Sequence, residues 1–144
     1  MSPDELAKRS ADAMWSNDDA SKSIGIKLDS VAPGTATVSM KVEQSHTNGH
    51  DICHGGFIFT LADTAFAFAC NSYNQVAVAQ HNSITFVAPG KLGDTLTAVA
   101  TEVNRGKRSG TYDAKVVNQN NETIALFRGN SRSLNATVIN DATS

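Results

Sequence analysis

The 144-residue sequence has little of several features that mark other classes of protein. It has only two cysteines, Cys53 and Cys70, and they do not form a CxxC pair. Its 12 Lys and Arg residues stand against 14 Asp and Glu residues, and this lack of a basic excess disfavours general nucleic-acid binding. No signal peptide and no long apolar run are present. We therefore expect a cytoplasmic protein that binds neither nucleic acid nor membranes.

Charged residues are also scarce, at 18% of the chain. In so small a protein, a low charged fraction is a weak indication that part of the outer surface contacts another subunit. The length suits one domain, residues 1–144, which would bury roughly 70% of the surface that the unfolded chain exposes. The sequence contains no internal repeat, low-complexity tract or linker.

The order of the helix and strand signals predicts an α+β fold. Ser2-Pro3-Asp4-Glu5 is typical of a helix start and predicts a helix over about 2–15. Apolar and polar residues alternate over 24–32 and 35–42, around Pro33-Gly34, as in a β-hairpin. Further on we expect a loop at 43–53, a buried helix at 55–71, strands at 76–88, 94–104, 110–118 and 122–134, and a frayed tail from about 135. One long helix among these strands predicts an antiparallel sheet curved around that helix.

The buried helix carries one carboxylate, Asp63, in its middle. A helix that is apolar on nearly every side belongs inside a protein. An ionised carboxylate buried there without partners is costly, so such groups are usually paired or used. No Lys or Arg lies between residues 42 and 90, and Thr60 and Thr64 are the only other polar side chains between Phe57 and Cys70. Asp63 is therefore a candidate catalytic residue, although a hydrogen-bonded core acid is the alternative.

His54-Gly55-Gly56 begins the same helix. Two adjacent glycines leave backbone N–H groups open to an anionic oxygen, and the helix dipole favours negative charge there. Gly56 precedes Asp63 by seven residues, which places the two on nearly the same helical face. An oxyanion hole beside a carboxylate would suit acyl transfer, whereas an ordinary glycine-containing loop is the alternative.

Two other arrangements of reactive side chains are weaker. His46, His50 and His54 recur every four residues, which on a helix would form a metal-binding stripe, but the glycines among them argue against a continuous helix. We expect no metal site. A thiol–imidazole pair of Cys53 and His54 is also disfavoured, because adjacent residues usually point apart. Cys70 is expected to be a small core residue.

The basic residues Arg105, Lys107 and Arg108 cluster within four positions. They would form a cradle for phosphate groups, with Arg128 and Arg132 as further candidates, or simply a solvated hairpin turn. The four phenylalanines at 57, 59, 66 and 68 are mainly core residues, of which one or two would line an acyl pocket.

Taken together, these motifs resemble those of the hotdog-fold acyl-CoA thioesterases, in particular the group that acts on hydroxyphenylacetyl-CoA in bacterial phenylacetate degradation. The resemblance covers roughly residues 24–134. It rests on the runs at 48–56 (Asn-Gly-His-Asp-Ile-Cys-His-Gly-Gly), 61–64 (Leu-Ala-Asp-Thr), 86–90, 93–96 and 125–129. It implies the hotdog fold, in which a curved antiparallel sheet wraps around a long central helix.

The resemblance also implies roles for the site residues. Asp63 would be the nucleophile or the general base, and the Gly55 N–H would stabilise the thioester oxygen. His54 and Asn48 would shape and polarise the site, and the other expected substrate and CoA contacts are Gly56, Thr64, Arg105, Lys107 and Arg108. Some relatives hold the attacking water with a Ser or Thr at the position of Ala79, so here Thr64 or a backbone atom would take that role.

The resemblance further implies a homodimer that forms each active site, and a homotetramer built from dimers. The expected reaction is hydrolysis of phenylacetyl-CoA and ring-hydroxylated phenylacetyl-CoA, with no cofactor beyond the CoA of the substrate. Two alternatives stay open: a hotdog enoyl-thioester hydratase or dehydratase that uses His54 and Asp63, and a non-catalytic acyl-CoA sensor.

Overall fold

A six-stranded antiparallel sheet curves around one long helix in the computed structural model, which describes residues 1–140. The helices are α1 (Pro3–Ser16), α2 (Asp19–Ser23) and α3 (Gly55–Cys70), with a short 3₁₀ turn at Gln44–His46. The strands are β1 (Lys27–Ala32), β2 (Thr35–Lys41), β3 (Ala77–Phe86), β4 (Thr95–Arg105), β5 (Ser109–Val117) and β6 (Thr123–Ser133). The predicted elements are thus confirmed, with shifts of a few residues at their ends.

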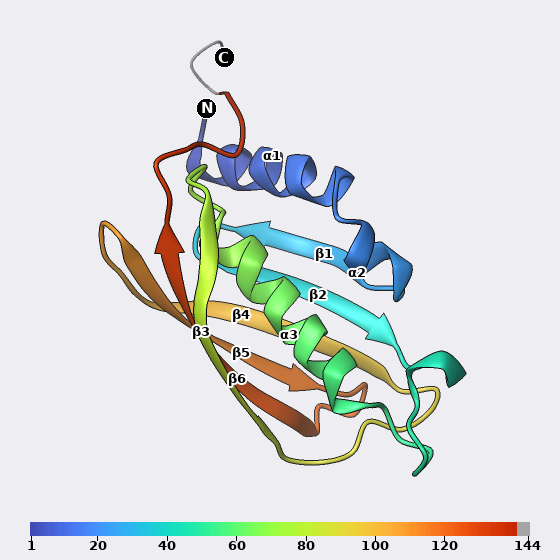
Figure 1. Ribbon diagram of the computed structural model, residues 1–144. Helices are drawn as coiled ribbons and strands as arrows, with labels where there is room; N and C mark the ends of the chain where they lie inside the picture. Colours follow the sequence, from blue (N-terminus) through green and yellow to red (C-terminus); the bar gives the residue numbers. More distant parts are fainter. Residues whose placement is uncertain (141–144) are drawn as a thin grey trace.

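The strands are arranged in the order β1-β2-β4-β5-β6-β3, so β1 and β3 form the two edges of the sheet. Helix α3 lies across the concave face and contacts all six strands (Figure 1). Helix α1 lies beside the C-terminal segment at one end of the sheet (Figure 1). This arrangement confirms the α+β prediction of a curved antiparallel sheet wrapped around a long central helix. None of the helices described is both long and apolar enough to span a membrane.

Small residues let α3 approach the sheet closely. Ala62, Ala65 and Ala69 are fully buried. On the sheet side, a Cβ atom at Gly129 would lie 2.9 Å from the ring of Phe66, so only glycine leaves room for that ring. Phe66 therefore anchors α3 against β6, and the burial of such a ring contributes roughly 1.5–3 kcal/mol.

Helix α2 was not predicted from the sequence. It has only five residues, and Asp18 caps it by accepting a hydrogen bond from the Ser21 N–H at 3.0 Å. A helix of five residues is too short to show an apolar periodicity in the sequence, and only the helix over about 2–15 was expected in this region.

The prediction of a frayed tail from about residue 135 is wrong for residues 135–140. Val76 donates its N–H to the Ala136 carbonyl at 2.9 Å. Asn74 bonds Ile139 twice, accepting from its N–H at 2.7 Å and donating to its carbonyl at 3.1 Å. These contacts join the tail to the loop after α3, where it covers the end of the molecule near α1. The rest of the expected frayed tail, 141–144, lies outside the described residues.

Strand β3 contains a bulge that changes which side chains face α3. Ala79 is opposite Ser131 and His81 is opposite Asn130, so β3 advances two residues where β6 advances one. After the bulge, Asn82 is opposite Gly129 on the face that α3 covers. Strict alternation from Ala79 would have turned His81 to that face, and an extra residue re-aims the side chains that follow it.

Candidate active site

Asp63 projects from the middle of α3 toward the edge strand β3. Its Oδ1 atom accepts a hydrogen bond from Asn82 Nδ2 at 2.9 Å. Burial raises the pKa of Asp63 above the usual value of an aspartate, and the Asn82 hydrogen bond lowers that pKa in part. A carboxylate in this setting binds a proton more readily than an exposed one, which favours its use as a proton acceptor.

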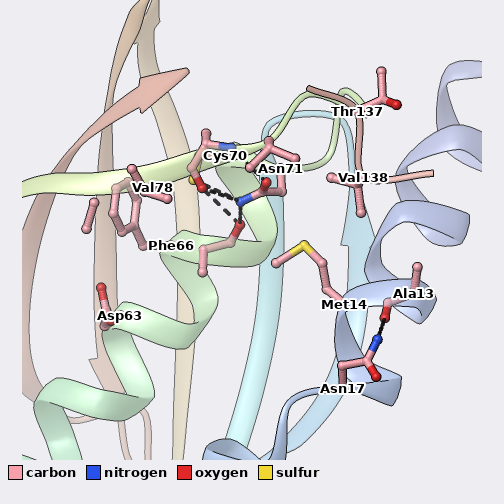
Figure 2. A pocket seen from close by; sticks show the side chains of 14 residues that line it. Ala13, Met14, Asn17, Asp63, Phe66, Cys70, Asn71, Val78, Thr137 and Val138 are labelled. Atoms are coloured by element: carbon pink, nitrogen blue, oxygen red, sulfur yellow. Dashed lines mark hydrogen bonds between the residues drawn. The ribbon is translucent and has the colours of Figure 1, made fainter. Parts of the chain in front are cut away.

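A cavity of about 540 Å³ opens beside Asp63. Figure 2 shows Asp63 and Phe66 of α3 on one side of this cavity, with Met14 of α1 and Asn17, the residue after α1, on the other. Strand β3 and the C-terminal residues Thr137 and Val138 complete the walls. The volume is in the range of small-molecule sites. Among the described residues that line it, Asp63 and Cys70 are the only titratable ones.

The start of α3 offers one free N–H group. His54 caps the helix, because its Nδ1 atom accepts the Gly56 N–H at 2.9 Å. Within residues 1–140 the Gly55 N–H has no protein acceptor. The sequence expectation of two open N–H groups is therefore reduced to Gly55 alone. This group lies at the positive end of the helix dipole, where a developing oxyanion is favoured.

A second cavity, of about 510 Å³, lies at this end of α3. Asn48, Gly55 and Phe86 are among its walls. The Phe86 ring packs over Gly55 so closely that a Cβ atom at Gly55 would lie 2.9 Å from Phe86 Cζ. Asn48 Oδ1 accepts the His50 N–H at 2.9 Å, which closes a turn within the loop that precedes α3.

The two ends of the candidate site are separate within one chain. Eight residues of α-helix rise about 12 Å, so Gly55 and Asp63 cannot both touch one thioester carbonyl, which requires contacts of about 3 Å. The two cavities also have no described wall residue in common. Within one chain, these two groups of α3 therefore lie too far apart to act on the same substrate.

Two other candidate side chains make structural contacts. Thr64 is buried, and its Oγ1 atom donates to the Thr60 carbonyl at 2.7 Å and lies 3.3 Å from Ser21 Oγ of α2. Thr64 therefore turns away from the Asp63 cavity. His46 uses Nδ1 to accept the Glu43 N–H and Nε2 to contact the Ile24 carbonyl, so it closes a turn.

The two cysteines are buried, as expected for Cys70. The Cys53 thiol contacts the His54 carbonyl oxygen, at 3.7 Å, and not the imidazole. Burial raises the pKa of Cys53 to about 11 and that of Cys70 to about 12. Both thiols are thus neutral near pH 7 and unsuited to nucleophilic chemistry.

The basic residues lie on the turn between β4 and β5, where Arg105, Lys107 and Arg108 are exposed. The Arg105 guanidinium lies over the Tyr73 ring, 3.7 Å from its centroid. Arg105 and Lys107 line a shallow surface hollow of about 460 Å³. Of the further candidates, Arg128 already makes a two-bond ion pair with Asp113, at 2.6 and 2.9 Å.

Comparison with known proteins identifies the family. The model of the thioesterase superfamily matches residues 50–125, which include both Gly55 and Asp63. The chain belongs to the thioesterase superfamily. It is 48% identical to the acyl-coenzyme A thioesterase PaaI of Escherichia coli K12 over 136 residues, 94% of this chain and 97% of the relative.

Solved structures of superfamily members show the same architecture. The structure of E. coli PaaI, a protein of the phenylacetic acid degradation operon, superposes with a TM-score of 0.93 over 94% of this chain and 99% of that one. A Streptococcus mutans protein solved with acetyl-CoA bound is 28% identical, with a TM-score of 0.76 over 78% of this chain and 91% of that one. The fold of this thioesterase-superfamily chain is therefore the hotdog fold.

One polar side chain next to Asp63 was missed by the sequence analysis. Asn82 lies in a run of β3 that gives no motif, and strict alternation would place it on the outer face. Bulges are not readable from a single sequence, so the contact between Asn82 and Asp63 required the structure.

Proposed function

We propose that this chain hydrolyses acyl-CoA thioesters, and that phenylacetyl-CoA and ring-hydroxylated phenylacetyl-CoA are among its substrates. The observation that carries the proposal is the half-buried Asp63 carboxylate on the wall of a cavity of about 540 Å³, with no Lys or Arg among the described residues around it. The resemblance to PaaI from the phenylacetic acid degradation operon supports the aromatic acyl group.

We further propose that the site forms between two copies of the chain. The separation of about 12 Å between Gly55 and Asp63 along α3 is removed if a second α3 packs antiparallel to the first. Gly55 of one copy then faces Asp63 of the other. A two-fold axis produces two such sites, because it repeats every contact.

The edge strand β3 supports this pairing. It is ten residues long, and the segment Ala77–Phe86 contains neither Pro nor Lys, which are the residues that commonly block edge pairing. Val78, Phe86 and Val87, along and just after β3, are 47%, 50% and 54% exposed. Pairing of β3 with β3 of a second copy would cover these side chains and bring the two α3 helices together. A tetramer would then form from two such dimers.

In this site, the Gly55 N–H and the Asp63 carboxylate have different roles in the reaction. The Gly55 N–H stabilises the negative charge on the thioester oxygen, and the Asn48 amide lies at the same end of α3. Asp63 takes a proton from a water whose oxygen adds to the carbonyl carbon. The C–S bond then breaks, the carboxylic acid is released, and the CoA thiolate takes up the proton. Direct attack by Asp63, giving a mixed anhydride that water then hydrolyses, leads to the same products.

Substrate contacts follow from the same placement. The acyl group would occupy the cavity beside Asp63, whose walls include Phe66, Met14 and Val78. The phosphates of CoA would contact Arg105, Lys107 and Arg108, since Arg and Lys are favoured by phosphate. The Arg105 side chain is already held over Tyr73, which reduces the entropy lost when it binds an anion.

The test follows free CoA thiol with a thiol reagent for phenylacetyl-, hydroxyphenylacetyl-, benzoyl- and straight-chain acyl-CoAs. The wild type should release thiol, and Asp63→Asn should lose at least a hundredfold in kcat while it keeps the fold. Turnover retained by Asp63→Asn would remove Asp63 from the mechanism. Binding of acyl-CoA without release of thiol would instead indicate a sensor, and loss of enoyl absorbance without thiol release a hydratase.

A further inference from the structure

The amide of Asn82 is the only side chain that the structure places in hydrogen-bond contact with Asp63 among residues 1–140. Asn82 Nδ2 donates to Asp63 Oδ1 at 2.9 Å, from the strand that faces α3. A donor in this position binds the ionised carboxylate more strongly than the neutral acid. The contact therefore orients the carboxylate of the candidate catalytic group and favours its charged form.

The other end of the same amide is unpaired. Asn82 Oδ1 is buried and has no hydrogen-bond partner among the described residues. A buried acceptor left unpaired costs roughly 1–3 kcal/mol, so such atoms are rare and call for an explanation. The orphaned oxygen belongs to the same amide group that holds Asp63, which places an unused acceptor next to the reacting carboxylate.

Strand β3 is shaped so that this amide faces Asp63. The extra residue between Ala79 and His81 reverses the alternation of the strand and turns Asn82 toward α3. On β6, the residue opposite Asn82 is Gly129, which adds no side chain to that face. Ala79 itself lines the Asp63 cavity but offers no polar atom. Asn82 is thus the polar group that β3 presents to Asp63.

We propose that Asn82 is a positioning residue of the hydrolytic site: Nδ2 holds the Asp63 carboxylate, and Oδ1 accepts a hydrogen bond from the attacking water. This inference rests on the proposed thioesterase function. The water donates one proton to Asp63 and directs its other O–H to Asn82 Oδ1, so that its oxygen lone pair faces the thioester carbon. Asn82 neither gains nor loses a proton in the reaction.

The pH dependence of the site is simple to interpret, because few groups titrate near Asp63. On α3 the neighbouring titratable side chain is Cys70, whose pKa is raised to about 12 by burial and which stays neutral. Helix α1 and the residue after it contribute Ala13, Met14 and Asn17 to the cavity wall, and none of these side chains titrates. The same holds for Thr137 and Val138 of the C-terminal segment. On β3 the facing group is Asn82. The acidic limb of kcat/KM is therefore assigned to Asp63, with His54 of the second copy, beside the facing Gly55, as the other titratable group of the shared site.

The experiment measures kcat and KM for acyl-CoA hydrolysis between pH 4 and 9 for the full-length wild type, Asn82→Ala and Asn82→Asp. A matched control is Asn130→Ala, since Asn130 lies on the outer face of β6 and its amide oxygen accepts only from Thr111. We expect Asn82→Ala to lower the plateau kcat roughly ten- to a hundredfold, with KM little changed. Its acidic limb should move to higher pH, because Asp63 loses the donor that favours its charged form.

The aspartate side chain of Asn82→Asp has nearly the same size and shape as asparagine. This variant therefore provides the test if Asn82→Ala does not fold. It should move the acidic limb further up than Asn82→Ala does, because two carboxylates then share the site, and it should lower kcat at pH 7. Asn130→Ala should leave both the limb and kcat unchanged. An unmoved limb in either folded Asn82 variant would overturn the proposal, and so would recovery of the full wild-type kcat by Asn82→Ala at high pH.

The two levels of the proposal fail differently. If the wild type releases no thiol from any acyl-CoA, the proposed function is wrong. If Asp63→Asn is fully active, Asp63 has no role in the mechanism, and the role proposed for Asn82 is wrong with it. If Asp63→Asn is inactive while Asn82→Ala behaves as the wild type, the function stands and only the role of Asn82 is wrong.

Discussion

His54 caps α3 through its ring: the Nδ1 atom accepts the Gly56 N–H at 2.9 Å and so leaves the Gly55 N–H as the free donor at the helix start. A histidine in this position has a structural role that is separable from any contact with substrate. Asn is among the preferred N-cap residues and can accept the same N–H.

We therefore predict that His54→Asn keeps the stability of the wild type, whereas His54→Ala loses about 0.5–2 kcal/mol, as other cap removals do. Chemical denaturation of both variants measures this difference. If His54 also polarises the thioester, kcat will fall in His54→Asn although its stability does not change. Equal stability of the two variants would show that the cap contributes nothing.

Asp63 should reduce the stability of the folded protein at neutral pH. Burial raises the pKa of Asp63 in the folded state above the ordinary value of 3.8. The Asp63 carboxylate therefore binds a proton more tightly in the folded state than in the unfolded chain. Stability contributed by Asp63 is full below pH 3.8 and is lost as the pH rises through the raised folded pKa. Asp63→Asn should therefore melt at a higher temperature than the wild type at pH 7–8, and this advantage should shrink toward acid pH.

Asp113→Asn is the matched control, because the pKa of Asp113 is shifted down where that of Asp63 is shifted up. Its hydrogen bonds to Arg128 lower the pKa of Asp113, so its contribution to stability is present above the unfolded pKa and is lost as the pH falls through the lowered one. This variant should melt slightly below the wild type at pH 7, since an exposed ion pair contributes little. Thermal melts of the three proteins across pH would contradict the account if Asp63→Asn lost stability at pH 7–8.

The basic residues Arg105, Lys107 and Arg108 of the turn between β4 and β5 are predicted to bind the CoA part of the substrate and not its acyl group. Arg105→Ala and Lys107→Ala should each raise KM for acyl-CoA, by up to roughly fivefold, since an exposed charge contributes about 1 kcal/mol at most. The corresponding acyl-pantetheine, which lacks the nucleotide, should be hydrolysed equally well by all variants. Lys115→Ala, on the outer face of β5, removes the same kind of charge elsewhere and should leave KM unchanged. A similar rise of KM in Lys115→Ala would indicate a general charge effect.

The cavity beside Asp63 should set the size of the acyl group. Ala79→Leu adds three carbon atoms to its wall and should lower kcat/KM for phenylacetyl-CoA roughly ten- to a hundredfold, because each misplaced methylene costs about 1–3 kcal/mol. Acetyl-CoA, which needs little of the cavity, should be hydrolysed nearly as before. Equal losses for both substrates would mean that the acyl group lies elsewhere.

The fold could be predicted from the sequence because its signals are local. Alternation identifies the strands, and an apolar run behind two glycines identifies α3. The parts that could not be predicted depend on contacts between distant residues. Residues 135–140 are ordered by Asn74 and Val76, which are about sixty residues earlier. The bulge that turns Asn82 toward Asp63 depends on the register between β3 and β6.

The sequence singles out the candidate groups one by one, and only the family resemblance implies that two copies of the chain assemble the site. Asp63 stands out because a carboxylate is conspicuous in an apolar helix, and Gly55 because it follows a histidine at a helix start. Helical periodicity places Gly56 and Asp63, seven residues apart, on nearly the same face of α3. It says nothing about distance along the axis, where the rise of about 1.5 Å per residue separates Gly55 from Asp63. That separation is why the account requires a second copy of the chain.

The most direct test of this shared site mixes two inactive variants. Asp63→Asn removes the carboxylate. Gly55→Pro removes the free N–H at the first helical position, where the helix backbone tolerates proline. The proline ring also displaces the exposed Phe86 ring, and kcat should fall by at least about 10²–10³. In a hybrid dimer, Gly55 of the first variant faces Asp63 of the second and restores one site. Equal amounts of the two variants, unfolded and refolded together, should recover about a quarter of wild-type thiol release, as random pairing gives. No recovery, from a mixture shown to contain hybrids, would contradict a site built from two chains.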